Sequence, residues 1–162
     1  MYHIRECPCF SIPSKGYLFQ IINLAVIHKI RVDFPEIKTI DLELDDKIAP
    51  KTVKAFIGNL PLTVGINSWG EELYTSETPV KVGEENAKPL VDLMDVAYWP
   101  QGKAICLFFG PTPIGKQGEI RAYSPVNVMG KIKNTDKKFL KDVSDGMIIR
   151  SEERRVGKEC RL

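Results

Sequence analysis

Histidine, the most common general base and a frequent zinc ligand, is nearly absent from this sequence. His3 and His28 are the only two, and both precede residue 29. A Ser-His-Asp or Cys-His arrangement therefore has no histidine in residues 29–149, and the usual zinc ligand sets lack one as well. The carboxylates in this region also lack a metal-binding spacing, so we expect no metal and no cofactor.

Two other features could take part in acid–base or nucleophilic chemistry. Glu71 and Glu72 are adjacent, and adjacent residues of a strand point to opposite faces, so at most one of them can face a pocket. Cys106 lies in the apolar run of residues 104–109, which predicts a buried and unreactive thiol. A cysteine nucleophile needs a basic partner, and none is evident. The sequence thus argues against a carboxylate dyad and against cysteine catalysis.

Aromatic side chains give a better candidate for a binding site, and both tryptophans of the chain belong to it. The set comprises Trp69, Tyr74, Tyr98, Trp99 and Phe108. Such rings can form a cleft that stacks a flat apolar group, oriented by Asn67, Glu72 and Arg121. The alternative is that the rings fill the core and cover its rim. We favour that alternative for Phe108, whereas both interpretations stay open for Trp69 and Trp99.

Charge and composition exclude several classes of partner. Residues 29–149 contain 16 Lys and Arg against 17 Asp and Glu, with the signs interspersed, so no basic surface for nucleic acid is expected. No apolar run approaches the ~20 residues of a membrane-spanning helix, so we expect no membrane partner. Cys106 is the single cysteine of this region, which indicates a reducing compartment, the cytoplasm. Nothing in the sequence predicts an oligomeric state.

The two ends of the chain differ from its centre in their sequence patterns. Residues 1–28 form a leader whose apolar stretch, residues 17–27, allows three interpretations: a misplaced start codon, an extra packed segment, or a signal peptide. Residues 150–162 are mostly charged and have no hydrophobic period, and they resemble one translated frame of a sequencing adapter. We therefore expect the folded domain to span residues 29–149, with an artefactual tail of residues 150–162 that is detached from the core.

Short strands dominate the expected structure of the central region. Residues 30–34 and 39–44 alternate apolar and polar residues with the period of a half-buried strand. Residues 104–109 form a continuous apolar run that fits a strand buried on both faces, and residues 126–132 predict a further strand. Helices are expected near residues 51–59, with Pro50 in the first turn, and near residues 137–143. Many short strands with frequent Gly and Pro turns indicate a mainly β fold, a barrel.

Several segments resemble the cyclophilins, peptidyl-prolyl isomerases built on an eight-stranded barrel capped by two helices. Residues 43–44, 49–53 and Phe56 are similar to their first hairpin and helix, and residues 107–109 and 128–132 to their later strands. Residues 67–74, 95–100 and 107–113 look closer still to the small prokaryotic cyclophilin-like proteins. The resemblance covers residues 30–149 and implies a cyclophilin-like closed β-barrel with two short capping helices.

The resemblance supports the cyclophilin fold more strongly than the cyclophilin activity. Cyclophilins hold a catalytic arginine in a Phe-His-Arg segment followed by Gln-Gly-Gly, whereas the equivalent residues 67–74 contain Trp69, Glu71 and Glu72 and no arginine. Arginine assists isomerisation by hydrogen-bonding toward the prolyl nitrogen, and Arg121 is the best candidate left. We therefore expect a domain that binds a peptide or small apolar ligand in the aromatic cleft, with weak or no isomerase activity. The alternative is an active peptidyl-prolyl isomerase.

Overall fold

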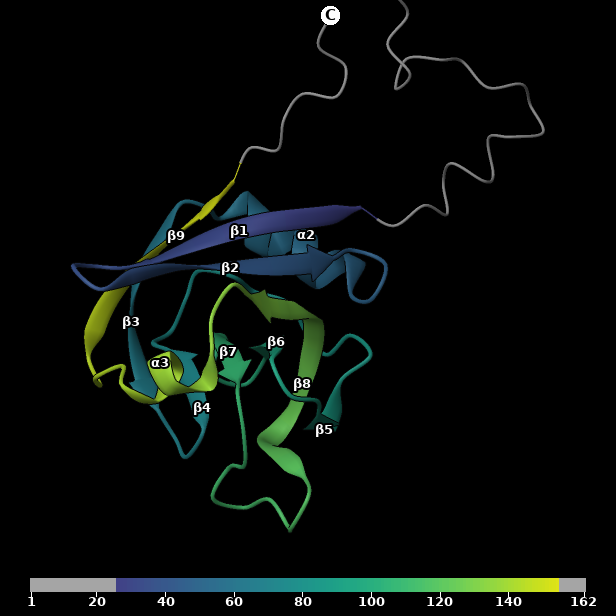
Figure 1. Cartoon of the computed structure of the whole chain (residues 1–162). Coiled ribbons are helices and arrows are strands. Elements are labelled where there is room, and N and C mark those ends of the chain that lie inside the picture. The colour runs from purple at the N-terminus through teal and green to yellow at the C-terminus, as the bar shows by residue number, and fades with distance from the viewer. Residues whose placement is uncertain (1–25, 155–162) are drawn as a thin grey trace, which may run out of the picture.

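Antiparallel strands close into a barrel in the computed structural model, which describes residues 26–154 (Figure 1). Around the ring the strands follow the order β2-β1-β9-β3-β4-β7-β6-β8, and β8 pairs with β2 to close it. The ring strands are β1 (Ile27–Phe34), β2 (Lys38–Asp45), β3 (Leu62–Ser68), β4 (Glu72–Thr75), β6 (Asp95–Trp99), β7 (Ala104–Phe108), β8 (Ile120–Lys133) and β9 (Met147–Glu153). A further strand, β5 (Lys88–Val91), pairs with β8 outside the ring. The expected closed β-barrel is confirmed.

The first hairpin follows directly from the alternation in the sequence. β1 and β2 pair antiparallel, with Val32 opposite Ile40. Ile30, Val32 and Phe34 are buried on β1, as are Ile40, Leu42 and Leu44 on β2, while the residues between them are exposed or half-buried. One face of this hairpin therefore closes the barrel interior, and the other carries the charged residues.

Two short helices accompany the strands, as the sequence predicts. Helix α2 (Pro50–Gly58) has Pro50 in its first turn, where the missing amide proton costs nothing. The Glu85 carboxylate accepts hydrogen bonds from the backbone amides of Lys51 and Thr52 at 3.0 and 2.8 Å, so a distant loop caps this helix. Helix α3 (Lys137–Lys141) is capped locally, because the Asp136 side chain accepts from the Phe139 amide. Neither helix of the described region is long and apolar enough to cross a membrane.

The barrel wall is buried on both of its faces along β6, β7 and the middle of β8. On β7, Ile105 and Leu107 join the main core, whereas Cys106 and Phe108 belong to a second buried cluster on the opposite face. The sequence prediction that this strand is buried on both faces is confirmed. The second cluster contains Val91, Ala97, Cys106, Phe108, Ala122, Val126 and Val128. Because it lies outside the barrel interior, this cluster can support a surface site.

Strand β9 corrects the expected boundary at residue 149. Residues 150–153 do not detach: Arg150 pairs with Asp33 of β1 and with Thr63 of β3, and Ser151 is buried. A mostly charged segment can form this strand because backbone hydrogen bonds to neighbours on both sides do not depend on side-chain polarity. The rest of the expected tail, residues 155–162, lies outside the described residues, as do residues 1–25 of the leader.

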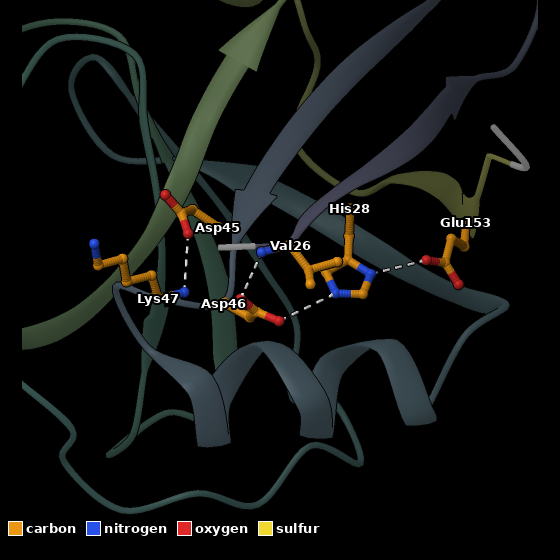
Figure 2. Close-up of polar contacts among 6 residues, drawn as sticks. All are labelled: Val26, His28, Asp45, Asp46, Lys47 and Glu153. Carbon is orange, nitrogen blue, oxygen red and sulfur yellow. Dashed lines mark hydrogen bonds and ion pairs between the residues drawn. The ribbon is translucent and has the colours of Figure 1, made fainter. Parts of the chain in front are cut away.

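A polar cluster joins the beginning and the end of the described chain (Figure 2). The His28 ring points between two carboxylates, with Nδ1 3.0 Å from Glu153 and Nε2 3.8 Å from Asp46. The other Asp46 oxygen accepts a hydrogen bond from the Val26 amide at 2.9 Å. The domain therefore begins before residue 29, with His28 already part of β1.

Candidate functional site

A cavity of about 160 Å³ lies over the second buried cluster, on the outer face of the barrel wall. An engineered apolar cavity of about this size holds one benzene molecule, so the space suits a single small ring or a compact branched group. Strands β4, β6, β7 and β8 supply most of its lining. The lining residues are Trp69, Glu72, Tyr74, Trp99, Cys106, Ala122, Tyr123 and Val126.

Three aromatic rings stand next to one another at this cavity. The Tyr123 ring centroid lies 6.0 Å from that of Trp69 and 5.9 Å from that of Trp99, each pair edge-to-face at 70°. Trp69 and Trp99 are half-buried, whereas Tyr123 is 69% exposed. Edge-to-face contacts of this kind add about 0.5–1.5 kcal/mol per pair beyond burial, so the rings hold one another in place.

Trp99 is also fixed by its surroundings. Its indole Nε1 donates a hydrogen bond to the Ser124 hydroxyl at 2.6 Å. The ring covers Gly102 so closely that a Cβ at this position would lie 2.3 Å from ring carbons. The turn after β6 therefore needs glycine at residue 102, and it presents Trp99 as a rigid wall of the cavity.

The polar part of the lining is a buried carboxyl group. Glu72 is only 5% exposed, and burial raises its pKa to about 7, partly offset by a hydrogen bond from the Cys106 thiol. Cys106 is 1% exposed, and burial, with the neighbouring Glu72 adding to it, raises the pKa of its thiol well above the usual range. The thiol is therefore a poor nucleophile, as the sequence predicts.

The adjacent Glu71 has the opposite environment. Its carboxylate lies 2.6 Å from the Lys137 ammonium and 2.9 Å from that of Lys141, both on α3. Burial alone would raise the pKa of Glu71, but hydrogen bonds and charge from these two lysines outweigh it and lower the pKa. Only Glu72 lines the cavity, in agreement with the prediction that the two glutamates cannot form a dyad.

The structure brings together half of the residues expected at the site. Trp69, Glu72, Tyr74 and Trp99 line the cavity, and so their expected grouping is reproduced. The expectation that Tyr98 lines the site is wrong. Tyr98 is fully buried in the main core, where its hydroxyl donates a hydrogen bond to the Val80 carbonyl at 2.6 Å. The physical reason is strand alternation, which turns Tyr98 inward when Trp99 faces the cavity.

Three further expected residues do not line the cavity. Phe108 is fully buried in the second cluster, the interpretation that the sequence favours for it. Asn67 lies on β3, paired with Tyr74, and is half-buried. The Arg121 guanidinium lies 3.4 Å from the Glu119 carboxylate, and no arginine of residues 26–154 lines the cavity. The assignment of a catalytic role to Arg121 therefore has no support from the cavity's geometry.

Four lining residues were not proposed for the binding site from the sequence. Ala122, Tyr123 and Val126 lie on β8, which begins at Ile120, six residues before the strand expected from the sequence. Cys106 was expected to be buried but not to border a cavity. The alternation of polar and apolar residues in residues 120–123 is a weak signal that could have extended the strand and found Tyr123.

A second hollow, of about 520 Å³, lies beside α2 near the cluster of Figure 2. Its lining includes His28, Asp46 and Lys54. The His28 ring and the Asp46 carboxylate are engaged with neighbouring groups that join β1, β2 and β9. No group of three or more His, Cys, Asp or Glu side chains between residues 26 and 154 could hold a metal ion. The aromatic cavity is thus the better candidate site.

Comparison with known proteins places the chain in a family. The model of the Cyclophilin-like family matches residues 28–152. The chain belongs to this family. The cyclophilin-like chain is also similar to a solved structure, the solution structure of the hypothetical protein AF2241 from Archaeoglobus fulgidus. The two share 44% sequence identity with a TM-score of 0.68, over 81% of this chain and 98% of that chain. A search of curated proteins finds no match.

The family match agrees with the corrected domain limits. It begins at His28 and ends at Glu152, and so includes all of β1 except Ile27 and all of β9 except Glu153. The cyclophilin-like domain is therefore several residues longer than residues 29–149.

Proposed function

We propose that this cyclophilin-like domain binds a small ligand, or one side chain of a peptide, in the aromatic cavity and has weak or no isomerase activity. The observation that carries the proposal is the pairing of an aromatic wall with a lining that lacks any arginine among the described residues. A preorganised charged donor typically contributes ~10²–10³ in rate, so a cavity without one is suited to binding more than to isomerisation. Among residues 26–154, Cys106 has no second cysteine with which to form a disulfide, and this supports action in a reducing compartment such as the cytoplasm.

Binding can be followed without any label. Trp69 and Trp99 are the two tryptophans of the chain, and both line the cavity. Their fluorescence and their two indole N–H signals in NMR spectra therefore report on this site alone. Titration with compounds that carry one small apolar ring, including N-acetylproline amide, is expected to shift both indole signals. Unchanged indole signals throughout a broad small-molecule screen would contradict the proposal.

The alternative, an active peptidyl-prolyl isomerase, makes a different prediction. Arg121 lies directly before Ala122, a lining residue, and is the nearest arginine in sequence to the cavity lining. If it acted on a bound proline, Arg121→Ala would abolish isomerisation of a proline-containing peptide. Our proposal predicts turnover far below that of a typical cyclophilin, and ligand binding that Arg121→Ala leaves unchanged. Rapid turnover lost in the variant would favour the isomerase.

A further inference from the structure

The chemical character of the cavity lining specifies its ligand more closely than its size does. Four aromatic side chains contribute, Trp69, Tyr74, Trp99 and Tyr123, and among residues 26–154 Glu72 alone adds a carboxyl group. The faces of such rings carry negative potential and attract cations, most strongly those of tryptophan. The remaining lining residues, Cys106, Ala122 and Val126, are small or apolar.

Glu72 is a buried acid without a cationic partner. It is 5% exposed, and no Lys, Arg or His nitrogen of residues 26–154 lies within 4.0 Å of its carboxylate. The nearest charged neighbour in sequence, Glu71, faces away and pairs with Lys137 and Lys141 of α3. A buried carboxylate is costly unless a cation or several hydrogen bonds compensate it, and the thiol of Cys106 gives only a weak one.

We infer that the cavity is an aromatic cage for an organic cation, a methylated ammonium group whose charge is balanced by Glu72. This inference rests on the proposed function, that the cavity binds a ligand, and specifies the ligand's class. A methylated ammonium group suits this lining because its methyl groups contact the rings while its charge meets the carboxylate. A primary ammonium, which is strongly hydrated, fits a mostly apolar lining less well.

Two sources share this chemistry, a free quaternary amine and a methylated lysine of a peptide. The cavity holds the head group in either case, because its volume of about 160 Å³ leaves no room for a longer chain. The half-buried and exposed rings at the rim would leave the rest of either ligand outside.

The test uses a pair of probes with the same shape and different charge. Choline and 3,3-dimethylbutan-1-ol differ in one atom, a nitrogen cation against a neutral carbon. Titration of the full chain at about pH 8, followed by the two indole N–H signals, is expected to give at least roughly tenfold tighter binding of choline. A peptide that carries trimethyllysine, against its unmodified lysine form, distinguishes the peptide source from the free amine.

The carboxyl group supplies the second arm of the test. Glu72→Gln keeps the shape of the side chain and is expected to remove the preference for choline while the neutral alcohol still binds. Glu71→Gln, on the opposite face, is the matched control and is expected to keep the preference.

Glu72 gains a proton as pH falls through about 7, so the preference for choline is expected to decline at about pH 5. The other titratable side chains that line the cavity with Glu72 are Tyr74, Tyr123 and Cys106, and burial raises the pKa of the Cys106 thiol.

The outcomes separate this inference from the proposed function. Equal or tighter binding of the neutral alcohol at about pH 8 would overturn the cation cage and leave a neutral apolar site. A preference for choline that persists in Glu72→Gln would overturn the role of the carboxylate. Absence of any shift with both probes, with the trimethyllysine peptide and with the ring compounds above would overturn both proposals.

Discussion

The His28 imidazole and the Glu153 carboxylate lie 3.0 Å apart, although 125 residues separate them in the chain (Figure 2). This contact joins β1 to β9, which pair antiparallel from Ile30 with Glu153 to Asp33 with Arg150. Arg150 and Ser151 of this segment also pair with β3 on the other side. Residues 150–153 therefore join three strands of the barrel.

Truncation after residue 149 is consequently expected to destabilise the protein. It removes hydrogen bonds to both neighbouring strands and the buried Ser151, so we expect a loss of roughly 2–4 kcal/mol in the free energy of unfolding. Urea denaturation of the truncated and full chains measures it. Removal of residues 155–162 alone is the control and is expected to leave stability unchanged. Equal stability of the chain that ends at residue 149 would show that β9 beyond Ile149 contributes nothing.

The stability of the protein is expected to depend on pH through Glu72. Its pKa is raised from 4.5 to about 7 in the folded state, so the folded state holds the proton more tightly than the unfolded state. Such a group stabilises the fold at low pH, and this contribution is lost as pH rises through the folded pKa. Between the unfolded pKa of 4.5 and the folded pKa of about 7, the contribution of Glu72 to the free energy of unfolding falls by about 3 kcal/mol at most.

Glu72→Gln removes this dependence. The difference in the free energy of unfolding between the variant and the wild type is expected to favour the variant more at about pH 8 than at about pH 5. Urea denaturation of both proteins at both pH values measures it. Glu71→Gln serves as the control: because the pKa of Glu71 is lowered, this residue is ionised at both values, and the effect of its substitution should be the same at each. A Glu72→Gln effect independent of pH would contradict the raised pKa.

Cys106 is expected to resist alkylation in the folded protein. The thiol is 1% exposed and its pKa is raised by burial and by the neighbouring Glu72, so little thiolate is present at neutral pH. Iodoacetamide treatment followed by peptide mass spectrometry should find the Cys106 peptide unmodified in buffer and fully modified in urea. Mapping by peptide keeps Cys7, Cys9 and Cys160 separate from this result. Fast modification of Cys106 in buffer would show that the reagent reaches the thiol through the cavity in the folded protein.

Gly102→Ala is expected to disturb the cavity through Trp99. The new Cβ would lie 2.3 Å from ring carbons of Trp99, so the ring must move. Overpacking of this kind costs about 1–3 kcal/mol, and displacement of the ring should shift tryptophan emission and weaken ligand binding. Gly83→Ala is the control, because a Cβ there meets nothing within 4 Å. Unaltered emission and binding in Gly102→Ala would mean that Trp99 does not form a rigid wall.

The sequence by itself determined the fold class and the main elements of the central region. The alternation in residues 30–34 and 39–44 specifies which face of the first hairpin is buried, because a half-exposed strand has one apolar side. The apolar run of residues 104–109, the proline at the start of α2 and the resemblance of residues 30–149 together predicted a closed cyclophilin-like barrel. Of the eight residues expected at a site, four line one cavity: Trp69, Glu72, Tyr74 and Trp99.

Tertiary structure alone decided which face of the doubly buried strands lies inside the barrel. β6 is almost entirely buried, so its pattern does not tell whether Tyr98 or Trp99 faces inward. The closure of β8 onto β2 and β6 settles this and places Tyr123 beside the two tryptophans, while the pairing of β4 with β7 places Cys106 near Glu72. Tertiary structure also decided the conformation of residues 150–153. Their charged side chains carry no strand signal, and their order comes from backbone hydrogen bonds to β1 and β3, strands that precede them by more than eighty residues.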